Sequence, residues 1–338
     1  MIASDKQQRV YNEFETTNRN IIIEAVAGSG KTTTLLHLLS MAGKTLFLSF
    51  NNSIQKEIEG KIAQNQLANA KAQTLHSLGY ETLRTLFPRV KVNNNKGWDI
   101  INATNRMFKS AFQDRDIDWK DANKIVMSVR EMWEISRIYL TRDVGQILRY
   151  ADIMDKLMKK PTLGYGEDKQ TDINFLTELF NYFVKVADSY YEKSTLEIDF
   201  TDMIYIPVIK NIPIPVICDN VFIDECQDLN LMQHKLVDML ISKPCIKKWV
   251  AVGDRNQSIY GFVGAFPKSF DLYEAKENTI SLPLDINYRC PRKVIDHANL
   301  VFNNLVPFKT EEGVFENFGK DKKLFLGMCK EIITNNED

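Results

Sequence analysis

The 338-residue sequence contains only five cysteines, and no two of them form a C-x-x-C pair. Their number is odd and their spacing irregular, which argues against a disulfide framework or a zinc ribbon. We therefore expect a reducing, intracellular environment: the cytoplasm, or the nucleus in a eukaryote. The cysteines stand at Cys218, Cys226, Cys245, Cys290 and Cys329.

The sequence also lacks an excess of charge and a long apolar run. Its 43 Lys and Arg residues balance 44 Asp and Glu residues, giving a formal net charge of −1. This balance excludes attachment to nucleic acid by bulk positive charge, but local basic grooves and stacking on bases remain open. The most apolar stretch, 203–218, is too short to span a bilayer and holds three prolines, so we predict no contact with a membrane. The first residues lack the pattern of a secretory signal.

The chain length predicts about two domains, and the order of elements predicts their type. Residues 21–26 form a β-branched run typical of a buried parallel strand. A glycine-rich segment follows, then an apolar helix at 33–41 and a strand at 45–50. The order strand, loop, helix, strand predicts an α/β fold with a parallel sheet. Further strands are predicted at 216–218, 221–223 and 248–252, and a helix at 292–303.

Residues 81–193 differ from the rest of the chain in composition and in the spacing of their apolar residues. Glycine is sparse there, and apolar and aromatic residues recur at helical intervals, so we predict a mostly helical insertion. We expect its tryptophans, Trp98, Trp119 and Trp133, to lie in the core, because large aromatic side chains mostly pack.

Residues 25–32, AVAGSGKT, come close to the phosphate-binding pattern G-x-x-x-x-G-K-[ST], with alanine at the first glycine. Glycines let backbone N–H groups turn toward phosphate oxygens at a helix N-terminus. Lys31 can reach the β- and γ-phosphates, and the Thr32 hydroxyl can bind Mg²⁺. We therefore predict ATP and Mg²⁺ as cofactors; the alternative is a glycine-rich turn that binds nothing. The predicted nucleotide-binding residues are Ala27, Gly28, Ser29, Gly30, Lys31, Thr32 and Thr33.

Residues 221–228, VFIDECQD, are an apolar strand that ends in carboxylates. In an enzyme with a phosphate loop, this is the second metal element. Asp224 would hold Mg²⁺ directly or through water, and Glu225 would polarise the attacking water. On its own, the pattern also fits a solvated loop, and the upstream phosphate loop favours the catalytic interpretation.

Residues 253–265, GDRNQSIYGFVGA, together with the D-E-x-Q-D pattern, resemble the UvrD/Rep-like helicases of superfamily one, subgroup A. These are ATP-driven motors on single-stranded DNA, and their motifs recur here in order from Gln7 to Arg289. The resemblance implies a RecA-like phosphate-loop ATPase lobe formed by 1–80 and 194–280. It implies that 81–193 is an accessory helical insertion and that 281–338 begins a second RecA-like lobe.

The resemblance also implies roles around ATP. Gln7 would read the adenine edge, since a glutamine amide can donate and accept at once. Gln8 is the alternative register, and an ordinary polar helix start is the alternative interpretation. Gln257 would sense the γ-phosphate, Tyr288 would stack on adenine, and Arg289 would reach the γ-phosphate as arginine fingers do.

For DNA, the resemblance implies contacts from two loops and two rings. Asn51 lies in a motif Ia-like segment, and Thr74 and His76 lie in a motif Ib-like segment, although His76 also fits a hydrogen-bonded core position. Tyr260 and Phe262 would stack on bases, the alternative being that one of them packs in the core. Many relatives carry an arginine where this chain has Val263, so that contact is absent. For Asp199–Asp202, a D-F-x-D segment, we predict a structural turn.

Two motifs of the family's second lobe, a T-x-H-x-x-K-G-like and a V-A-x-T-R-like segment, are not found. The residues after Arg289 are also far fewer than the roughly 100–150 of a full lobe, so we expect an incomplete second lobe. The first hypothesis is a helicase or translocase that moves on single-stranded DNA or at a junction with duplex, in a family that mostly runs 3′ to 5′. The second is a module that binds ATP and single-stranded DNA, or a partner protein, without efficient turnover. A phosphate-loop kinase is the third, and it leaves the motif around Gln257 unexplained.

Overall fold

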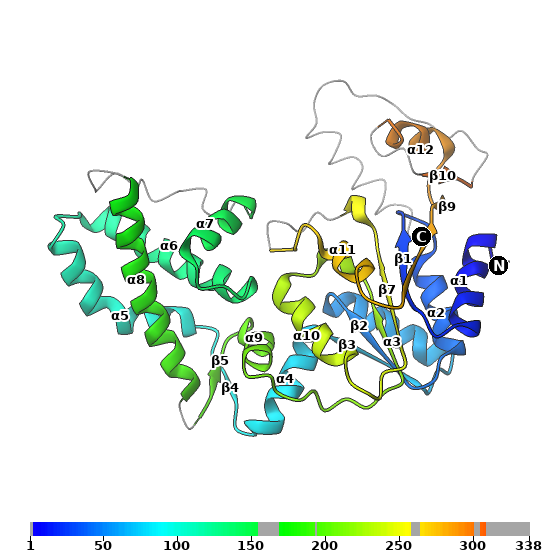
Figure 1. Ribbon diagram of the computed structural model, residues 1–338, viewed down its shortest axis with the longest axis horizontal. Coiled ribbons are helices and arrows are strands. Elements are labelled where there is room, and N and C mark those ends of the chain that lie inside the picture. The colour runs from blue at the N-terminus through cyan, green and yellow to red at the C-terminus, as the bar shows by residue number, and fades with distance from the viewer. Residues whose placement is uncertain (1–2, 155–168, 193–194, 258–263, 301–304, 309–338) are drawn as a thin grey trace. The chain divides into compact units, whose positions relative to one another are not determined.

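The computed structural model describes residues 3–154, 169–192, 195–257, 264–300 and 305–308. The described residues fall into two compact units (Figure 1). The first unit comprises the chain up to residue 25 together with 31–284, and the second comprises 26–30 with the residues from 285 onward.

The first unit is built on a six-stranded sheet in the order β3-β2-β6-β7-β1-β8, and every neighbouring pair is parallel. The predicted α/β fold with a parallel sheet is therefore confirmed. The strands are β1 (Asn20–Ala25), β2 (Thr45–Ser49), β3 (Ala70–Thr74), β6 (Asn220–Ile223), β7 (Lys248–Gly253) and β8 (Thr279–Leu284).

The strand sequences explain the pairing. Ile22 of β1 lies opposite Ala251 of β7 and Ser281 of β8, so β1 is paired on both sides. Pro283 lies in β8, which is an edge strand in this sheet and tolerates the missing N–H. The predicted strand at 216–218 is wrong. The ladder begins only at Asn220, and the Val216 carbonyl accepts from the Lys243 ammonium at 2.5 Å instead of from a neighbouring strand.

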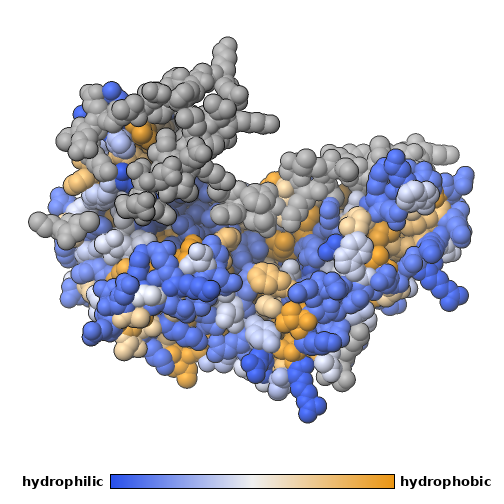
Figure 2. Space-filling model, turned by 180° about the vertical axis from the view of Figure 1, so that it is seen from behind, coloured by the Kyte–Doolittle hydropathy of each residue, from blue (hydrophilic) through white to orange (hydrophobic). Residues whose placement is uncertain are grey.

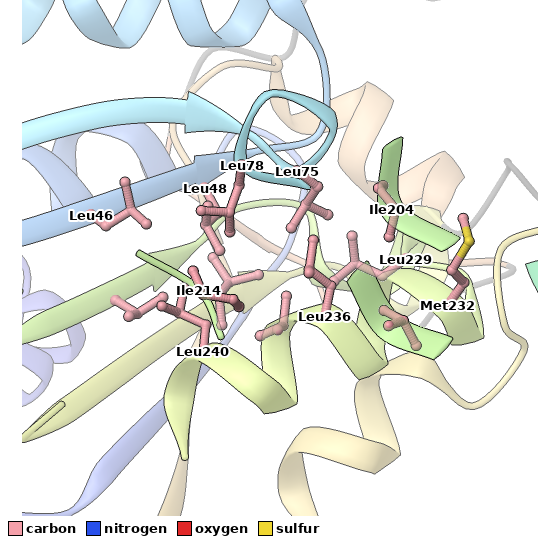
Figure 3. Packing of buried hydrophobic residues seen from close by; sticks show 14 of the residues in the cluster. Leu46, Leu48, Leu75, Leu78, Ile204, Ile214, Leu229, Met232, Leu236 and Leu240 are labelled. Atoms are coloured by element: carbon pink, nitrogen blue, oxygen red, sulfur yellow. The ribbon is translucent and has the colours of Figure 1, made fainter. Parts of the chain in front are cut away.

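Two hydrophobic clusters cover the two faces of the sheet, because alternate strand residues point to opposite sides. One contains Leu46, Leu48 and Ile223 with residues of α4, α9 and α10 (Figure 3). The other contains Phe47 and Phe222 with residues of α1, α2 and α3. The helices are α1 (Asp5–Thr16), α2 (Lys31–Met41), α3 (Asn52–Gln64), α4 (Leu75–Leu86), α9 (Asp202–Ile209), α10 (Leu231–Ile241) and α11 (Ser269–Glu274). Single 3₁₀ turns are η2 (Cys226–Asp228) and η3 (Arg255–Gln257).

The span 81–193 contains long helices with a core of their own. Trp133 is fully buried in that core and its ring lies 5.7 Å from the ring of Phe183. The expectation was wrong for Trp98 and Trp119, which are 49% and 77% exposed and lie in the first turns of two helices. The helices are α5 (Lys96–Gln113), α6 (Trp119–Ile138), α7 (Val144–Ile153) and α8 (Lys169–Ser189), followed by η1 (Tyr190–Glu192).

A short parallel pair joins the two ends of this span, since β4 (Lys91–Val92) pairs with β5 (Glu197–Ile198). In the second unit, β9 (Ile286–Asn287) pairs with β10 (Val306–Pro307), and α12 (Arg292–Ala298) lies between them in the sequence. The predicted helix 292–303 is shorter in the structure, since α12 ends at Ala298, and residues 301–303 of the prediction lie outside the described residues.

No helix among the described residues is long and apolar enough to cross a membrane. The face seen in Figure 2 is mostly hydrophilic, and its hydrophobic side chains occur in small separate groups. Four cysteines in the described part of the chain, Cys218, Cys226, Cys245 and Cys290, are free thiols.

Candidate functional site

Polar side chains follow the carboxyl ends of the parallel strands. Asn51 comes after β2, Thr74 ends β3, Asp224 comes after β6 and Asp254 comes after β7. Because all these strands run in the same direction, their carboxyl ends meet at one edge of the sheet. In open α/β sheets this edge is where ligands bind.

The first two catalytic candidates, Lys31 and Glu225, contact each other. The Lys31 ammonium, at the start of α2, donates to both Glu225 carboxylate oxygens at 3.0 Å. Gln227 Nε2 donates to the same carboxylate at 2.9 Å. Glu225 has a φ of +49°, in the left-handed region that a residue other than glycine adopts at an energetic cost. Strain of this kind concentrates at functional sites, so the backbone supports the catalytic interpretation of Glu225.

Asp224 lies next to Glu225 and is partly buried. Burial and the neighbouring Glu225 carboxylate raise the pKa of Asp224 to about 7, against the opposing effect of Lys31. Two adjacent carboxylates thus face a single ammonium, and a divalent cation would balance the remaining negative charge. The partly buried Thr32 hydroxyl, in the first turn of α2, adds a second oxygen ligand.

The donor set fits Mg²⁺ bound together with a nucleotide. No group of three or more His, Cys, Asp or Glu side chains that could hold a metal occurs among the described residues. Mg²⁺ usually takes only one or two protein oxygens and completes its shell with water and phosphate oxygens. Asp224 and Thr32 match that pattern.

In the second unit, residues 26–30 form the turn expected of a phosphate loop. Gly28 and Gly30 have φ values of +67° and +80°. A Cβ on Gly28 would lie 2.8 Å from Arg289 Cβ, so both the backbone and the space require glycine. The buried Ser29 hydroxyl has no hydrogen-bond partner within the described ranges. An unsatisfied donor in a turn of this type fits a phosphate oxygen.

The same unit brings Tyr288 and Arg289 to this turn. Tyr288 N donates to Gly28 O at 2.9 Å, and Asn287 Nδ2 donates to Ala27 O at 2.7 Å. The buried Asn287 also accepts from the backbone N–H of Arg289 at 2.9 Å. Sequence reasoning assigned Asn287 no role, although its place directly before the tyrosine and arginine was visible.

Gln7 is buried and already hydrogen-bonded. Its Oε1 accepts from Ser4 N at 3.0 Å as part of a capping box at the start of α1, and its Nε2 donates to Thr34 Oγ1 at 3.1 Å. An amide has two donor hydrogens and two acceptor lone pairs, so one of each remains for an adenine edge. Gln8 is exposed and bonds to Asn12, and Thr33 is exposed on α2.

Gln257 is connected to the acidic strand end by a chain of hydrogen bonds. Its Nε2 donates to Asp254 Oδ2 at 2.7 Å, and Asp254 N donates to Gln227 Oε1 at 3.1 Å. Gln227 in turn binds Glu225. Gly253 permits this arrangement, since a Cβ there would lie 2.3 Å from Gln227 Oε1. Gln227 was part of the quoted D-E-x-Q-D pattern, but sequence reasoning gave it no role.

The candidate DNA residues follow β2 and β3, which are neighbours in the sheet. Asn51 caps α3, its Oδ1 accepting from Ile54 N at 2.9 Å, and Thr74 caps α4, its Oγ1 accepting from Ser77 N at 3.1 Å. Tyr260, Phe262 and Val263 lie outside the described residues.

His76 has a partner that sequence reasoning missed. Its ring stacks on that of Phe200, with centroids 3.7 Å apart and planes 18° apart. Burial lowers the pKa of His76 to about 4, so its ring is neutral at physiological pH. Phe200 is 60% exposed, which is unusual for a phenylalanine. The signal was its position in the D-F-x-D segment, which was assigned only to a turn. Asp199 and Asp202 do form that turn.

The fold and the strand-end residues define a nucleotide-binding α/β protein of the phosphate-loop type. The family model for the UvrD/REP helicase N-terminal domain matches residues 4–278, and the chain belongs to this family. The recognised resemblance is therefore confirmed.

Curated relatives match along most of the chain. The ATP-dependent DNA helicase Rep of Buchnera aphidicola subsp. Schizaphis graminum is 26% identical, covering 94% of this chain and 47% of that protein. The ATP-dependent DNA helicases PcrA of Bacillus subtilis strain 168 and Staphylococcus aureus strain Mu50 are each 26% identical over 86% of this chain, covering 38% and 39% of their own lengths. The chain thus spans less than half the length of these relatives.

Proposed function

We propose that this chain is the ATP-hydrolysing, single-stranded DNA-binding part of an ATP-dependent DNA helicase of the UvrD/Rep type. The observation that carries the proposal is the shared edge of the sheet. Glu225 and His76 follow β6 and β3, which end at this edge, and Lys31 begins the helix after β1. Phe200 follows β5 of the separate β4–β5 pair and reaches the same edge through its stack on His76. A protein that couples hydrolysis to movement needs both kinds of site on one rigid sheet.

On the ATP side, the turn around Gly28, Ser29 and Gly30 presents backbone donors to phosphate oxygens. Lys31 would bind the β- and γ-phosphates, while Glu225 would orient and polarise the attacking water. When bound at Asp224 and Thr32, Mg²⁺ would supply positive charge to the phosphates. Gln7 would bind the edge of the adenine, and Tyr288 would stack on its face. Gln257 and Arg289 would then contact the γ-phosphate.

On the DNA side, the exposed Phe200 ring, backed by the neutral His76, presents an aromatic face on which a base can stack. Stacking of this kind is worth roughly 1–3 kcal/mol per base and needs no net positive charge. Asn51 and Thr74 lie on the adjoining helix starts, where short polar side chains suit contacts to phosphate and sugar. We propose single-stranded DNA, or its junction with duplex, as the partner, inside the cell.

The domain division proposed from the sequence places 1–80 and 194–280 in the motor lobe, 81–193 in an insertion and 281–338 at the start of a second lobe. We keep all of β8 with the motor lobe, because it pairs with β1 as far as Leu284. As in most of the family, we propose movement from 3′ to 5′.

The test is the rate of phosphate release with and without single-stranded DNA. The proposal predicts strong stimulation by DNA. In Phe200→Ala it predicts that half-maximal stimulation needs about a tenfold higher DNA concentration, with ATP affinity unchanged. ATP binding without stimulated hydrolysis would instead support the module that binds ATP and DNA without efficient turnover. Where stimulation is found, unwinding of duplexes with 3′ and 5′ overhangs tests the direction.

A further inference from the structure

The turn that carries Phe200 is braced by its two aspartates. Asp202 N donates to Asp199 Oδ1 at 2.8 Å, and Asp199 N donates to Asp202 Oδ2 at 3.1 Å. Phe200 and Thr201 lie between these two residues, at the outside of the turn. The positions of the two carboxylates therefore determine where the Phe200 ring stands.

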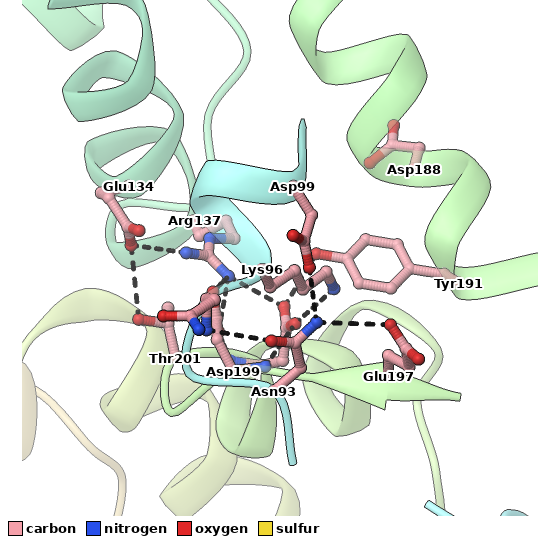
Figure 4. Close-up of polar contacts among 12 residues, drawn as sticks. Asn93, Lys96, Asp99, Glu134, Arg137, Asp188, Tyr191, Glu197, Asp199 and Thr201 are labelled. Atoms are coloured by element: carbon pink, nitrogen blue, oxygen red, sulfur yellow. Dashed lines mark hydrogen bonds and ion pairs between the residues drawn. The ribbon is translucent and has the colours of Figure 1, made fainter. Parts of the chain in front are cut away.

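Two buried cations from the helical span bind these carboxylates (Figure 4). Arg137 of α6 donates through Nη1 to Asp199 at 2.8 Å and to Asp202 at 2.9 Å. Lys96 of α5 donates to Asp202 Oδ2 at 2.5 Å. The side chains of Lys96, Arg137 and Asp202 are all 0% exposed. Tyr191 completes the set by donating to Asp202 at 2.8 Å.

Loss of either buried cation, Lys96 or Arg137, would disrupt the hydrogen bonds around Asp199 and Asp202. Burial alone would raise the pKa of Asp202, but Arg137 and Lys96 outweigh it and hold that pKa below its usual range. Removing a cation leaves a buried carboxylate without compensation, so the turn must open toward water or take up a proton. Either change alters the bracing of the turn and releases Phe200.

Arg137 also connects the turn to a third acid on its own helix. It binds Glu134, whose Oε2 lies 3.5 Å from the Thr201 hydroxyl. The core of the helical span, in contrast, is made of apolar side chains from α5 to α8. The charged network is thus an attachment between the helical span and the Phe200 turn. It also contacts the core of the span, since the Arg137 guanidinium lies 3.6 Å from the centre of the Trp133 ring.

We propose that Arg137 and Lys96 are positioning residues for single-stranded DNA, which hold the Phe200 ring against His76 through Asp199 and Asp202. This inference rests on the proposed function, because it takes the exposed Phe200 face as a contact for a base. It assigns the helical span a part in DNA binding that needs no direct contact with the strand.

The first measurement reports the ring stack without DNA. In protein labelled with ¹³C-histidine, the Phe200 ring shifts the His76 ring protons, and Phe200→Ala identifies that shift. We expect Arg137→Met and Lys96→Met to abolish most of it. Lys248→Met is the matched control, because that buried ammonium binds the carbonyls of Phe14 and Thr17 instead. We expect the control to keep the His76 signals in place even if it lowers stability.

The second measurement is the affinity for a fluorescent oligo(dT) and the DNA dependence of ATP hydrolysis. We expect the Arg137 and Lys96 variants to weaken DNA binding about tenfold, as loss of one stacked base would. The rate at saturating DNA should stay within about twofold, since the ATP site is untouched. Phe200→Ala combined with Arg137→Met should be no weaker than Phe200→Ala alone. If Arg137→Met does not fold, Arg137→Lys and Asp199→Asn are measured in its place. Arg137→Lys keeps the positive charge but removes the guanidinium that binds both aspartates. Asp199→Asn keeps the side-chain volume but removes the negative charge.

The outcomes separate the two proposals. Folded Arg137 and Lys96 variants with unchanged His76 signals, or with normal DNA affinity while Phe200→Ala binds weakly, would overturn the positioning role. If Phe200→Ala itself binds DNA normally, the proposed DNA face fails, whatever the His76 signals show.

Discussion

Lys31 and Glu225 are 194 positions apart in the sequence, yet the Lys31 ammonium donates to both Glu225 carboxylate oxygens at 3.0 Å. The Lys31 ammonium cannot keep both hydrogen bonds to Glu225 and also bind the β- and γ-phosphates of ATP. We therefore expect ATP to replace the carboxylate at Lys31, which frees Glu225 to orient water. The pair would thus hold the general base inactive until the nucleotide arrives.

Replacing Lys31 tests the first half of this exchange. Lys31→Met removes a charged donor to the phosphates, and hydrogen bonds to charged groups are worth about 1.5–3 kcal/mol. We expect the affinity for Mg²⁺–ATP to fall by about tenfold or more, measured by titration with a fluorescent ATP analogue. Unchanged affinity would mean that Lys31 serves only to neutralise Glu225.

Replacing Glu225 tests the second half. Glu225→Gln keeps the shape and an acceptor oxygen but cannot take a proton from water, and such catalysis is worth about 10²–10⁴-fold. We expect ATP to bind with similar or higher affinity and phosphate release to fall by about a hundredfold or more. Asp219→Asn, directly before the start of the same strand, is the control and should hydrolyse ATP normally. Normal turnover in Glu225→Gln would remove it from the mechanism.

Four strands of the sheet, β1, β2, β6 and β7, could be predicted because they are locally encoded, whereas β3 (Ala70–Thr74) and β8 were not predicted as strands. The β-branched runs at 21–26 and 221–223 match β1 and β6 to within one residue. The strand predicted at 216–218 failed, because the Val216 carbonyl is bound by the Lys243 ammonium, a contact that no local pattern records.

Motif spacing likewise identified the residues after each strand, because parallel strands bring these residues to one edge whatever lies between them. Phe200 and Arg137 could not be found in this way. Their roles depend on how α6 packs beside the turn before α9, and no local pattern records that Arg137 meets an aspartate 65 positions later. The exposed Trp119 was missed for the same reason, because helical spacing cannot distinguish a residue at a helix end from one facing the core.

Two glycines in helices give opposite predictions for stability. A Cβ on Gly79 of α4 would lie 2.1 Å from the Met203 carbonyl oxygen, so Gly79→Ala must push α9 away and should cost about 1–3 kcal/mol. Gly60 of α3 has no atom within 4 Å of its Cβ position, so Gly60→Ala should stabilise by about 0.5–1 kcal/mol. Urea unfolding of both variants measures these two changes in the free energy of unfolding. Equal effects would contradict the close approach of α4 and α9.

Two buried histidines predict how stability depends on pH. Burial, with a smaller contribution from Lys276, lowers the pKa of His234 to about 3, and burial lowers that of His76 to about 4. His234 Nε2 lies 2.5 Å from the Ser269 hydroxyl, so its neutral ring is also held by a hydrogen bond.

On unfolding, both rings return to a pKa near 6.5. Below that pH the unfolded chain binds more protons than the folded one, so the free energy of unfolding falls as the pH falls. Between about pH 7 and about pH 5, each histidine should contribute a loss of about 2 kcal/mol. Urea unfolding at these two pH values should show a smaller loss in His234→Gln and in His76→Gln. The two effects should add in the double variant, since neither ring bonds to the other. If the double variant loses as much free energy of unfolding between these pH values as the unchanged protein, other groups cause the acid sensitivity.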